Sequence, residues 1–439
     1  LFFADFILKD EDVSEILPAA DTVIFDEAHQ IPDVGSIFFG DNFSTIQILN
    51  LIQDIQLSFK NIAKNLEELD AICKDILIFI VELRNYLDPR NDRISYNKIP
   101  NKQEFTQKLE EVINEVSKLN NFIDLYKDQN PEMIKLSERI KSLVGITKIW
   151  GESDNNGYVY WIDVFAKSIQ FNITPISISD QFKNLQDKTK AAWIFTSATL
   201  AVNDSFEHFQ TMMGLEEAST LQLKSPFNYN ENACLYVPMD MPEPNTEMFN
   251  LALIKKVFPL ILAAKGRTFI LSTSIKSMNE ITSFLKDEFE KKNIEFPILT
   301  QGIAPKNMLL DQFKSHGNAV LVGSLSFWEG IDVRGSALSL VIIDKLPFQS
   351  PGDPVFESKI NMLKAKGGNP FMSLQLPQAI ITLKQGAGRL IRDEFDKGVL
   401  MICDLRIINK PYGKKIWRSL PAFKRTRDEN DAIEFLKRL

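Results

Sequence analysis

A short apolar run that ends in two adjacent carboxylates constrains the fold more than any other feature of this chain. Residues 22–25 read Thr-Val-Ile-Phe, and Asp26, Glu27, Ala28 and His29 follow directly. Ligands of parallel α/β sheets bind where strands end, so a buried strand that delivers Asp-Glu to such an edge indicates a site for Mg²⁺ and a nucleotide. The alternative is an N-cap for the next helix, because Asp is a good capping residue.

The composition is that of a globular protein with more than one domain. Of the 439 residues, 44% are hydrophobic and 25% are charged, so we expect two or three domains. The net charge of −8 argues against a generally basic nucleic-acid coat but not against a local basic groove. No apolar run approaches the roughly 20 residues of a membrane span. The three cysteines are too far apart for a metal site or a disulfide framework, so we expect a cytoplasmic protein without membrane contact.

The segment 42–148 is predicted to be an all-helical insertion. Apolar residues recur there with alternating spacings of four and three, from Ile48 to Leu83 and again from Phe105 to Tyr126. A spacing of about 3.5 residues is the signature of helices that pack as in coiled coils. A plain packing module and an arch that contacts nucleic acid both fit this pattern.

Short buried strands separated by helices fill the rest of the chain. Such alternation predicts an α/β fold with parallel sheets wound in βαβ units. A proline-rich stretch marks the best domain boundary. We therefore predict a first domain at 1–41 and 149–225, a linker at 226–248 and a second domain at 249–439. The predicted strands include residues 192–195, 268–271, 319–322, 340–343 and 399–402.

Two further blocks follow predicted strands. Ser197 and Thr199 can hydrogen-bond to the carboxylates and relay the state of the nucleotide, although an ordinary capped turn is the alternative. In the other block, Gly330 allows the backbone to approach a ligand closely. Its neighbour Asp332 can accept a hydrogen bond from a ribose hydroxyl, and a plain βα loop is the alternative.

The block from Gln385 to Arg392 is the most specific. Arg389 and Arg392 lie three residues apart, so a helix would place both on one face, with Gln385 one turn earlier. Paired guanidinium groups suit a γ-phosphate, because arginine is a permanent fork of donors that stabilises transition-state charge. A solvated basic helix is the alternative, but the glycines at 386 and 388 are poor choices for one.

Together these blocks describe two tandem nucleotide-binding domains with ATP between them, and they resemble the motifs of superfamily 2 DNA helicases of the DinG and XPD group. The resemblance is strongest to the YoaA-like branch of that group and spans nearly the whole chain. It implies two RecA-like parallel-sheet domains with an all-helical arch insertion in the first. The matching segments are Asp26 to His29 (motif II, a DEAH box), Ser197 to Thr199 (III), Arg267 to Ser274 (IV), Glu329 to Asp332 (V) and Gln385 to Arg392 (VI).

The resemblance also implies a reaction, namely ATP hydrolysis coupled to 5′-to-3′ movement and duplex unwinding in DNA repair or rescue of stalled replication. Asp26 would hold Mg²⁺, Glu27 would position the attacking water, and His29 would couple to motif III or VI. Gln385, Arg389 and Arg392 would address the γ-phosphate. The residues that would contact the nucleotide or link it to DNA movement are Ser197, Thr199, Glu329, Gly330 and Asp332.

The implied substrate is single-stranded or forked DNA. The implied protein partner is the chi subunit of the replicative clamp loader, with which YoaA-like proteins are associated. Channels for single strands combine a basic groove with aromatic stacking platforms. The candidates here are Trp328, Lys345, Phe348 and Lys384, and ordinary loop packing is the alternative for each.

Two departures from the family pattern concern the phosphate loop and the iron–sulfur cluster. The family's Walker A lysine and four cluster cysteines lie upstream of motif II, and no Gly-x-x-x-x-Gly-Lys-Ser/Thr occurs in this sequence. We therefore expect the chain to begin inside a longer protein, with any 4Fe–4S cluster in the missing part, and to be inactive as an ATPase by itself. The alternative function is a non-catalytic scaffold that binds another protein.

Overall fold

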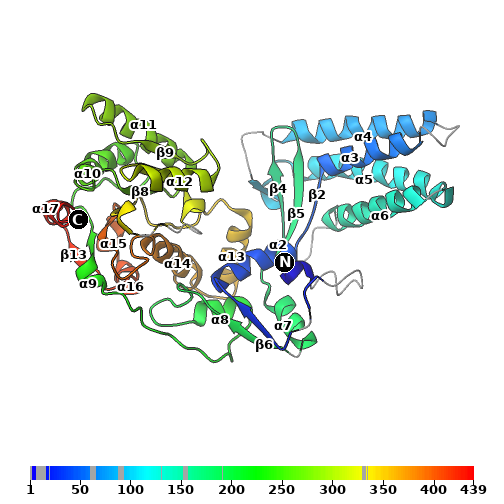
Figure 1. The fold of residues 1–439 in the computed structure, drawn as a ribbon. Helices are drawn as coiled ribbons and strands as arrows, with labels where there is room; N and C mark the ends of the chain where they lie inside the picture. Colours follow the sequence, from blue (N-terminus) through cyan, green and yellow to red (C-terminus); the bar gives the residue numbers. More distant parts are fainter. Residues whose placement is uncertain are drawn as a thin grey trace. The chain divides into compact units, whose positions relative to one another are not determined.

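The computed structural model (Figure 1) describes residues 2–5, 16–18, 20–59, 66–87, 93–129, 131–151, 157–189, 191–328, 333 and 335–439. They belong to two compact units with separate cores. The first unit comprises residues 1–196, 210–216 and 350–369, and the second comprises 197–209, 217–349 and 370–439. Within the described ranges, no helix is long and apolar enough to cross a membrane.

The first unit contains a two-stranded parallel sheet. Its strands are β1 (Thr22–Phe25) and β6 (Ala192–Phe195), paired in register from end to end. On one face, Phe25 and Trp193 pack edge-on against the ring of Phe2. On the other face, Ile24 and Ile194 are 64% and 45% exposed. Residues of alternating parity thus point to opposite faces, as expected for strands.

Four long helices of the first unit form a bundle (Figure 1). The apolar seams predicted from the spacing of three and four face one another, so that Ile55, Ile76 and Ile140 are completely buried. Packing of these seams, rather than helix propensity alone, stabilises helices of this length. The helices are α3 (Thr45–Phe59), α4 (Leu66–Tyr86), α5 (Lys102–Asp124) and α6 (Pro131–Gly151).

The structure corrects the prediction that 42–148 is entirely helical. β2 (Asp41–Ser44) reaches into this segment and β3 (Arg93–Ser95) lies inside it. With β4 (Tyr158–Val164) and β5 (Ile169–Pro175) they form an antiparallel sheet in the order β2-β5-β4-β3, whose side chains join the helical core. The sequence pattern does not reveal β3, because three residues are too few to show an alternation and the pairing with β4 decides its conformation.

Helix α13 (Pro354–Ala365) packs with the first unit although it falls within the predicted second domain. The Nη1 atom of Arg93 lies 2.8 Å from Oδ2 of Asp353, and Nζ of Lys98 lies 2.6 Å from Oε2 of Glu357. Asp353 also caps α13, because its Oδ1 accepts a hydrogen bond from Phe356 N. These contacts attach α13 to the antiparallel sheet.

The second unit is a seven-stranded parallel sheet in the order β13-β7-β12-β11-β8-β10-β9, which confirms the predicted α/β class. Alternate strand residues feed two cores. One core includes α10 (Phe249–Ala263), α11 (Ile275–Lys291) and α17 (Glu429–Lys437), and the other includes α12 (Lys306–His316), α14 (Leu376–Ala387) and α16 (Gly413–Ser419). The strands are β7 (Ala233–Tyr236), β8 (Thr268–Leu271), β9 (Ile298–Thr300), β10 (Val320–Gly323), β11 (Leu340–Ile343), β12 (Gly398–Ile402) and β13 (Lys424–Thr426).

The predicted linker, 226–248, contains the buried strand β7, so that prediction is wrong for residues 233–236. β7 pairs with β12 on one side and with β13 on the other. Pro238, Pro242 and Pro244 all follow the strand, so they cannot interrupt its ladder. The four apolar residues of β7 stand close to three prolines, so the local sequence only weakly indicates a strand. Pairing with β12 and β13 stabilises it as one.

Trp150 offers a test of the helical bundle. Its side chain is completely buried, and its Nε1 donates a hydrogen bond to Asn172 O at 3.2 Å. We expect Trp150→Ala to lower the free energy of unfolding of the first unit by about 3–5 kcal/mol, since it leaves a cavity and removes this hydrogen bond. The adjacent Ile149 is 50% exposed, so Ile149→Ala serves as control. Equal losses for both variants in urea unfolding would contradict this packing.

Candidate functional site

The Asp-Glu-Ala-His block begins where β1 ends. Oδ1 of Asp26 accepts hydrogen bonds from Thr196 Oγ1 at 3.1 Å and from Glu27 N at 2.9 Å. Ala28 N donates to Thr196 O at 2.9 Å, so the ends of β1 and β6 are tied together. The turn that follows has no side-chain capping bond. Both carboxylates are exposed at the carboxyl edge of a parallel strand pair, the position that the sequence predicts for them.

Glu27 has a strained backbone. Its φ of 49° and ψ of 43° lie in the left-handed region, which non-glycine residues seldom adopt. Its Oε2 lies 3.3 Å from Nδ1 of His29, whose side chain is only 8% exposed. Backbone strain of this kind amounts to about 1–3 kcal/mol and is concentrated at functional sites. At this strained position the carboxylate of Glu27 contacts the ring of His29.

Asp26 and Glu27 fit a magnesium ion that is held mainly by water and phosphate. Mg²⁺ commonly binds through one or two carboxylates plus phosphates and keeps several waters. The described residues contain no group of three or more His, Cys, Asp or Glu side chains that could hold a metal by themselves. The two carboxylates at this strand end would suit an ion whose remaining ligands are waters and the phosphates of a nucleotide.

Ser197 and Thr199 form a small turn after β6. Thr199 N donates to Ser197 Oγ at 3.1 Å, and the two hydroxyl oxygens lie 3.3 Å apart. This is the local turn that the sequence left open as an alternative. The coupling role of these hydroxyls stays a prediction.

Arg389 and Arg392 lie in a loop, not on a helix, and this corrects the prediction of a shared helical face. Helix α14 ends at Ala387, with Gly388 as its C-cap. The backbone N–H groups of Arg392 and Asp393 both donate to Oδ2 of Asp396 at 2.8 Å. The carboxylate of Asp396 therefore replaces the carbonyl acceptors that a further helical turn would have supplied.

The arginine loop, residues 388–397, is attached on both sides of motif V. Nε of Arg389 donates to Trp328 O at 2.6 Å, and Oδ1 of Asp396 accepts a hydrogen bond from Gly335 N at 2.8 Å. Asp396 is 5% exposed, so these bonds are shielded from water. Three predicted residues of motif V, Glu329, Gly330 and Asp332, lie outside the described residues.

Trp328 is completely buried, so the prediction that it stacks on DNA is wrong for this conformation. Its ring packs against the backbone of α14, where a Cβ at Gly386 would lie 2.8 Å from Trp328 Cε3. This contact explains the glycine inside a helix. Gln385, one residue earlier, is likewise buried at 7% exposure.

The other three candidates for DNA binding, Lys384, Lys345 and Phe348, differ in the contacts that their side chains make within the protein. Nζ of Lys384 donates to Ala201 O at 3.0 Å, and burial lowers the pKa of this lysine. Nζ of Lys345 lies 5.0 Å from the ring centroid of Phe249. Phe348 is half-buried in a cluster of aromatic rings. Of the four, Phe348 fits the predicted platform best.

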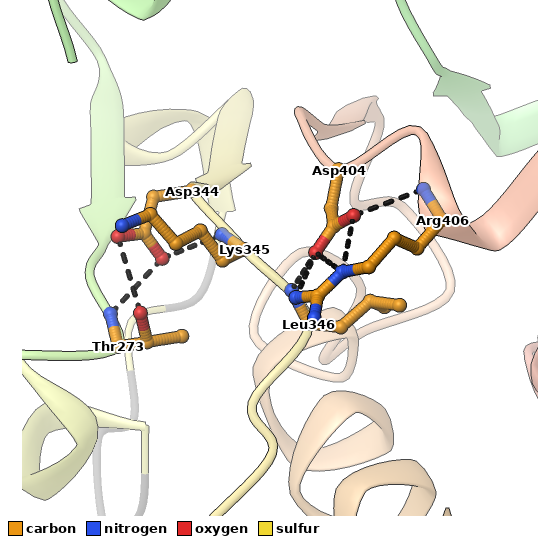
Figure 2. A network of polar contacts seen from close by, with 6 residues as sticks. All are labelled: Thr273, Asp344, Lys345, Leu346, Asp404 and Arg406. Carbon is orange, nitrogen blue, oxygen red and sulfur yellow. Dashed lines mark hydrogen bonds and ion pairs between the residues drawn. The ribbon is translucent and has the colours of Figure 1, made fainter. Parts of the chain in front are cut away.

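Asp344, at the end of β11, organises the carboxyl edge of the large sheet (Figure 2). Its side chain is completely buried and accepts hydrogen bonds from Thr273 N at 3.0 Å, Lys345 N at 2.6 Å and Ser277 Oγ at 2.9 Å. Burial raises the pKa of Asp344 to about 6, although these hydrogen bonds act in the opposite direction. Asp344 thereby joins the end of β8 to the start of the 344–348 loop.

Asp404, after β12, fixes the other side of the same loop (Figure 2). Its Oδ2 accepts a hydrogen bond from Leu346 N at 2.9 Å and lies 2.6 Å from Nη2 of Arg406. Asp404 is completely buried. A buried carboxylate with a bidentate arginine and a backbone donor holds its neighbours in one arrangement.

Sequence reasoning did not single out Asp344, Asp396 or Asp404. A signal existed for two of them, because Asp344 and Asp404 come at the ends of apolar strands, as Asp26 does. Asp396 gives no such signal, since its three backbone donors come from two separate loops.

The raised pKa of Asp344 predicts a pH dependence of stability. An unfolded Asp has a pKa of about 3.9, so the folded unit holds this proton more tightly and loses stability as the pH rises from about 4 to about 6. The full effect is at most about 3 kcal/mol. In Asp344→Asn the Oδ1 atom can still accept from Thr273 N and Lys345 N, so we expect a more stable protein above pH 6.

Urea unfolding across this pH range checks the prediction. The difference between wild type and Asp344→Asn should grow as the pH rises. Asp311, which is exposed on α12, supplies the matched control Asp311→Asn. A pH-independent difference for Asp344→Asn would contradict the prediction.

Comparisons with known proteins agree with this geometry. Residues 257–423 match the family model of a helicase C-terminal domain. The chain is 38% identical to the ATP-dependent DNA helicase YoaA of Haemophilus influenzae, over 100% of this chain and 68% of that protein. It is 40% identical to YoaA of Escherichia coli, over 99% and 68%. The ATP-dependent helicase DinG of Mycobacterium tuberculosis is 33% identical over 61% of this chain and 40% of its own length.

Solved structures of XPD proteins share the fold. One described as an XPD helicase aligns with a TM-score of 0.60 and 18% identity, over 96% of this chain and 71% of that chain. The Xpd4 structure from S. tokodaii aligns with a TM-score of 0.60 and 14% identity, over 95% and 80%. The RecA-like architecture predicted from the sequence is thereby confirmed, and the chain belongs to the DinG and YoaA family of ATP-dependent DNA helicases.

Proposed function

We propose that this chain is the strand-binding and arginine-bearing part of a 5′-to-3′ DNA helicase that acts in DNA repair or replication-fork rescue. The observation that carries the proposal is the 344–348 loop of the second unit. Asp344 and Asp404 hold its backbone from two sides, and it ends in a half-buried Phe348. A rigid loop that presents an aromatic ring suits the stacking of a base from a single strand.

The surroundings of Phe348 support this role. Its ring centroid lies 5.7 Å from that of Phe371 and 5.8 Å from that of Tyr412. The guanidinium of Arg406 lies 5.3 Å from the ring of Phe348. The turn after α15 (Arg406–Asn409) adds the exposed Lys410, and the first turn of α16 adds the exposed Lys414 and Lys415. Aromatic rings beside several cations are what a phosphate backbone with unstacked bases requires.

The nucleotide roles follow from the carboxylates and the arginine loop. Asp26 holds Mg²⁺ and Glu27 positions the attacking water, with His29 as its coupling partner. Arg389 and Arg392, with Gln385 behind them, address the γ-phosphate. Their permanent charge stabilises the charge that develops during phosphoryl transfer. The residues proposed to bind the nucleotide or link it to DNA movement are Ser197, Thr199, Glu329, Gly330 and Asp332.

Other parts of the proposal rest on the family alone. They are the clamp-loader chi subunit as partner and a 4Fe–4S cluster in a segment outside this chain, whereas the proposed cytoplasmic location rests on the cysteine usage. The rival function is a non-catalytic scaffold, favoured by the lack of a Walker A sequence in the chain. The scaffold would bind neither single-stranded DNA nor ATP.

Phe348→Ala tests the strand platform. We expect it to weaken binding of a single-stranded oligonucleotide by about 1–3 kcal/mol, because a stacked base loses its ring partner. Phe284 on α11 is likewise half-buried but packs against the other core of the second unit, so Phe284→Ala is the matched control. Fluorescence anisotropy at constant salt measures both, and thermal melts confirm that the variants fold. Equal affinities of Phe348→Ala and wild type would argue against the platform.

The second test concerns the reaction. We expect this chain alone to show no DNA-stimulated ATP hydrolysis, because its sequence contains no Walker A motif, whose lysine holds the phosphates. Phosphate release with and without single-stranded DNA is the measurement. Stimulated turnover that Arg392→Gln abolishes would show that the chain is catalytically sufficient and would refute the predicted inactivity.

A further inference from the structure

The connector that follows motif III, residues 200–208, belongs to the second unit and contains a tight turn. Val202 N donates to Ser205 O at 2.9 Å, and Ser205 N donates to Val202 O at 3.1 Å. Between them, Asn203 and Asp204 have positive φ angles of 50° and 62°. Positive φ at both central residues is typical of two-residue turns, and asparagine and aspartate tolerate it better than most residues. The local sequence therefore favours this turn.

The first half of the connector packs against the second unit. Leu200 and Ala201 are buried, and Val202 packs against the core that includes α14 and α16. Burial of apolar side chains stabilises such a contact roughly in proportion to the area that it removes from water. The turn is therefore held on this core by apolar packing in addition to the hydrogen bonds described next.

Lys384 bonds the connector to the last turn of α14. Its Nζ donates to Ala201 O at 3.0 Å. Burial lowers the pKa of Lys384, and the nearby carboxylate of Asp204 acts in the opposite direction. A hydrogen bond from a charged donor is stronger where water is partly excluded, because the local dielectric constant is lower. The half-buried ammonium of Lys384 therefore favours a fixed position of Ala201 on α14.

A second contact joins the connector to the segment that leads into α14. Nδ1 of His208, in α8 (Glu207–Met213), lies 3.1 Å from Ser373 O. Ser373 belongs to a π-helical turn, Phe371–Gln375, which continues directly into α14. Turns of this kind are rare and often occur at functional sites. The connector thus contacts the chain near both ends of α14.

Helix α14 in turn positions motif VI. Gln385 lies on it, and the arginine loop begins directly after its last residue, Ala387. Gly388 N donates to Lys384 O at 2.8 Å, so the first residue of the loop is bonded to the same lysine that holds the connector. On the other side, the connector directly follows Thr199 of motif III. Direct contacts therefore run from motif III through the connector and Lys384 to the arginine loop.

We propose that Lys384 is a positioning residue that couples motif III to motif VI by fixing the connector to α14 through Ala201 O. The inference rests on the proposed function, in which motif III relays the state of the nucleotide and motif VI addresses its γ-phosphate. It gives Lys384 a role different from the DNA binding that the sequence predicts, because its ammonium contacts a backbone carbonyl of the protein.

Hydrogen exchange of the full chain tests this coupling. Lys384→Met keeps a long side chain but removes its charge. We expect it to raise the exchange rates of backbone amides in both 200–205 and 385–392 by about tenfold, as for the loss of one hydrogen bond to a charged group. Lys384→Arg retains a charged donor and should restore most of the protection. Lys256→Met is the matched control, because Lys256 is a half-buried lysine of α10, in the other core.

A change in the turn separates coupling from local packing. Asn203→Val should loosen the turn, since a β-branched residue is strained at a φ of 50°, whereas Asn203→Gly should preserve it. Both variants remove the contact of Asn203 Oδ1 with Ser419 Oγ at 3.1 Å, so their difference reports on the turn alone. Asn203→Val should raise exchange in 385–392 when Lys384 is present and much less in Lys384→Met. Such non-additivity measures the interaction directly.

Three results would overturn the proposal. They are unchanged exchange of 385–392 in Lys384→Met, equal effects of Asn203→Val in both backgrounds, and a Lys384→Met protein that binds a single-stranded oligonucleotide less tightly while its exchange is unchanged. The last result would assign Lys384 to the strand. If Lys384→Met does not fold, Asn203→Val alone decides, because its effect must reach 385–392. Phe348→Ala and the hydrolysis assay test the proposed function separately, so the two failures are distinguishable.

Discussion

Buried carboxylates that accept backbone N–H bonds hold the two loops to which we assign functional roles. A carboxylate without water is strongly destabilising unless its oxygens are hydrogen-bonded, so Asp344 and Asp404 can be completely buried only where donors surround them. Those donors are backbone amides of loops that have no regular structure of their own. These hydrogen bonds therefore do two things: they make burial of the carboxylate possible, and they hold the backbone of the loop in place. Phe348 owes its defined position to this pair of aspartates.

The same device holds the arginine loop. Asp396 accepts hydrogen bonds from Gly335 N on one oxygen and from Arg392 N and Asp393 N on the other. It therefore links motif VI to the segment that follows motif V, although 61 residues separate Asp396 from Gly335. In the first unit, Asp26 contacts Thr196 across 170 residues in a simpler version of this arrangement. Motifs II and VI are thus each positioned by a hydrogen bond to a segment that is remote in sequence.

The sequence predicted those features that depend on local periodicity. Buried strands such as β6, β8 and β11, and the helical seams around Ile76 and Ile140, follow from apolar spacing alone. Features that depend on remote partners could not be predicted in this way. β3 and β7 exist because of their neighbours in the sheets, and the arginines lie in a loop because Asp396 replaces a helical turn. The sequence predicts an exposed loop position for Trp328, because it does not show that Gly386 of α14 packs against the tryptophan ring.

Carboxylates and guanidinium groups meet different conditions at the edges of a parallel sheet. Loops at strand ends offer many backbone N–H donors, so an aspartate such as Asp344 can be satisfied within the protein. An arginine needs acceptors, and carbonyl oxygens can serve only those of its five N–H donors that reach them. At Arg267 two nitrogens are served by Ala264 and Ser336, and Nη2 is not. The protein therefore satisfies these buried carboxylates with its own backbone N–H groups, whereas one nitrogen of the Arg267 guanidinium stays buried without an acceptor.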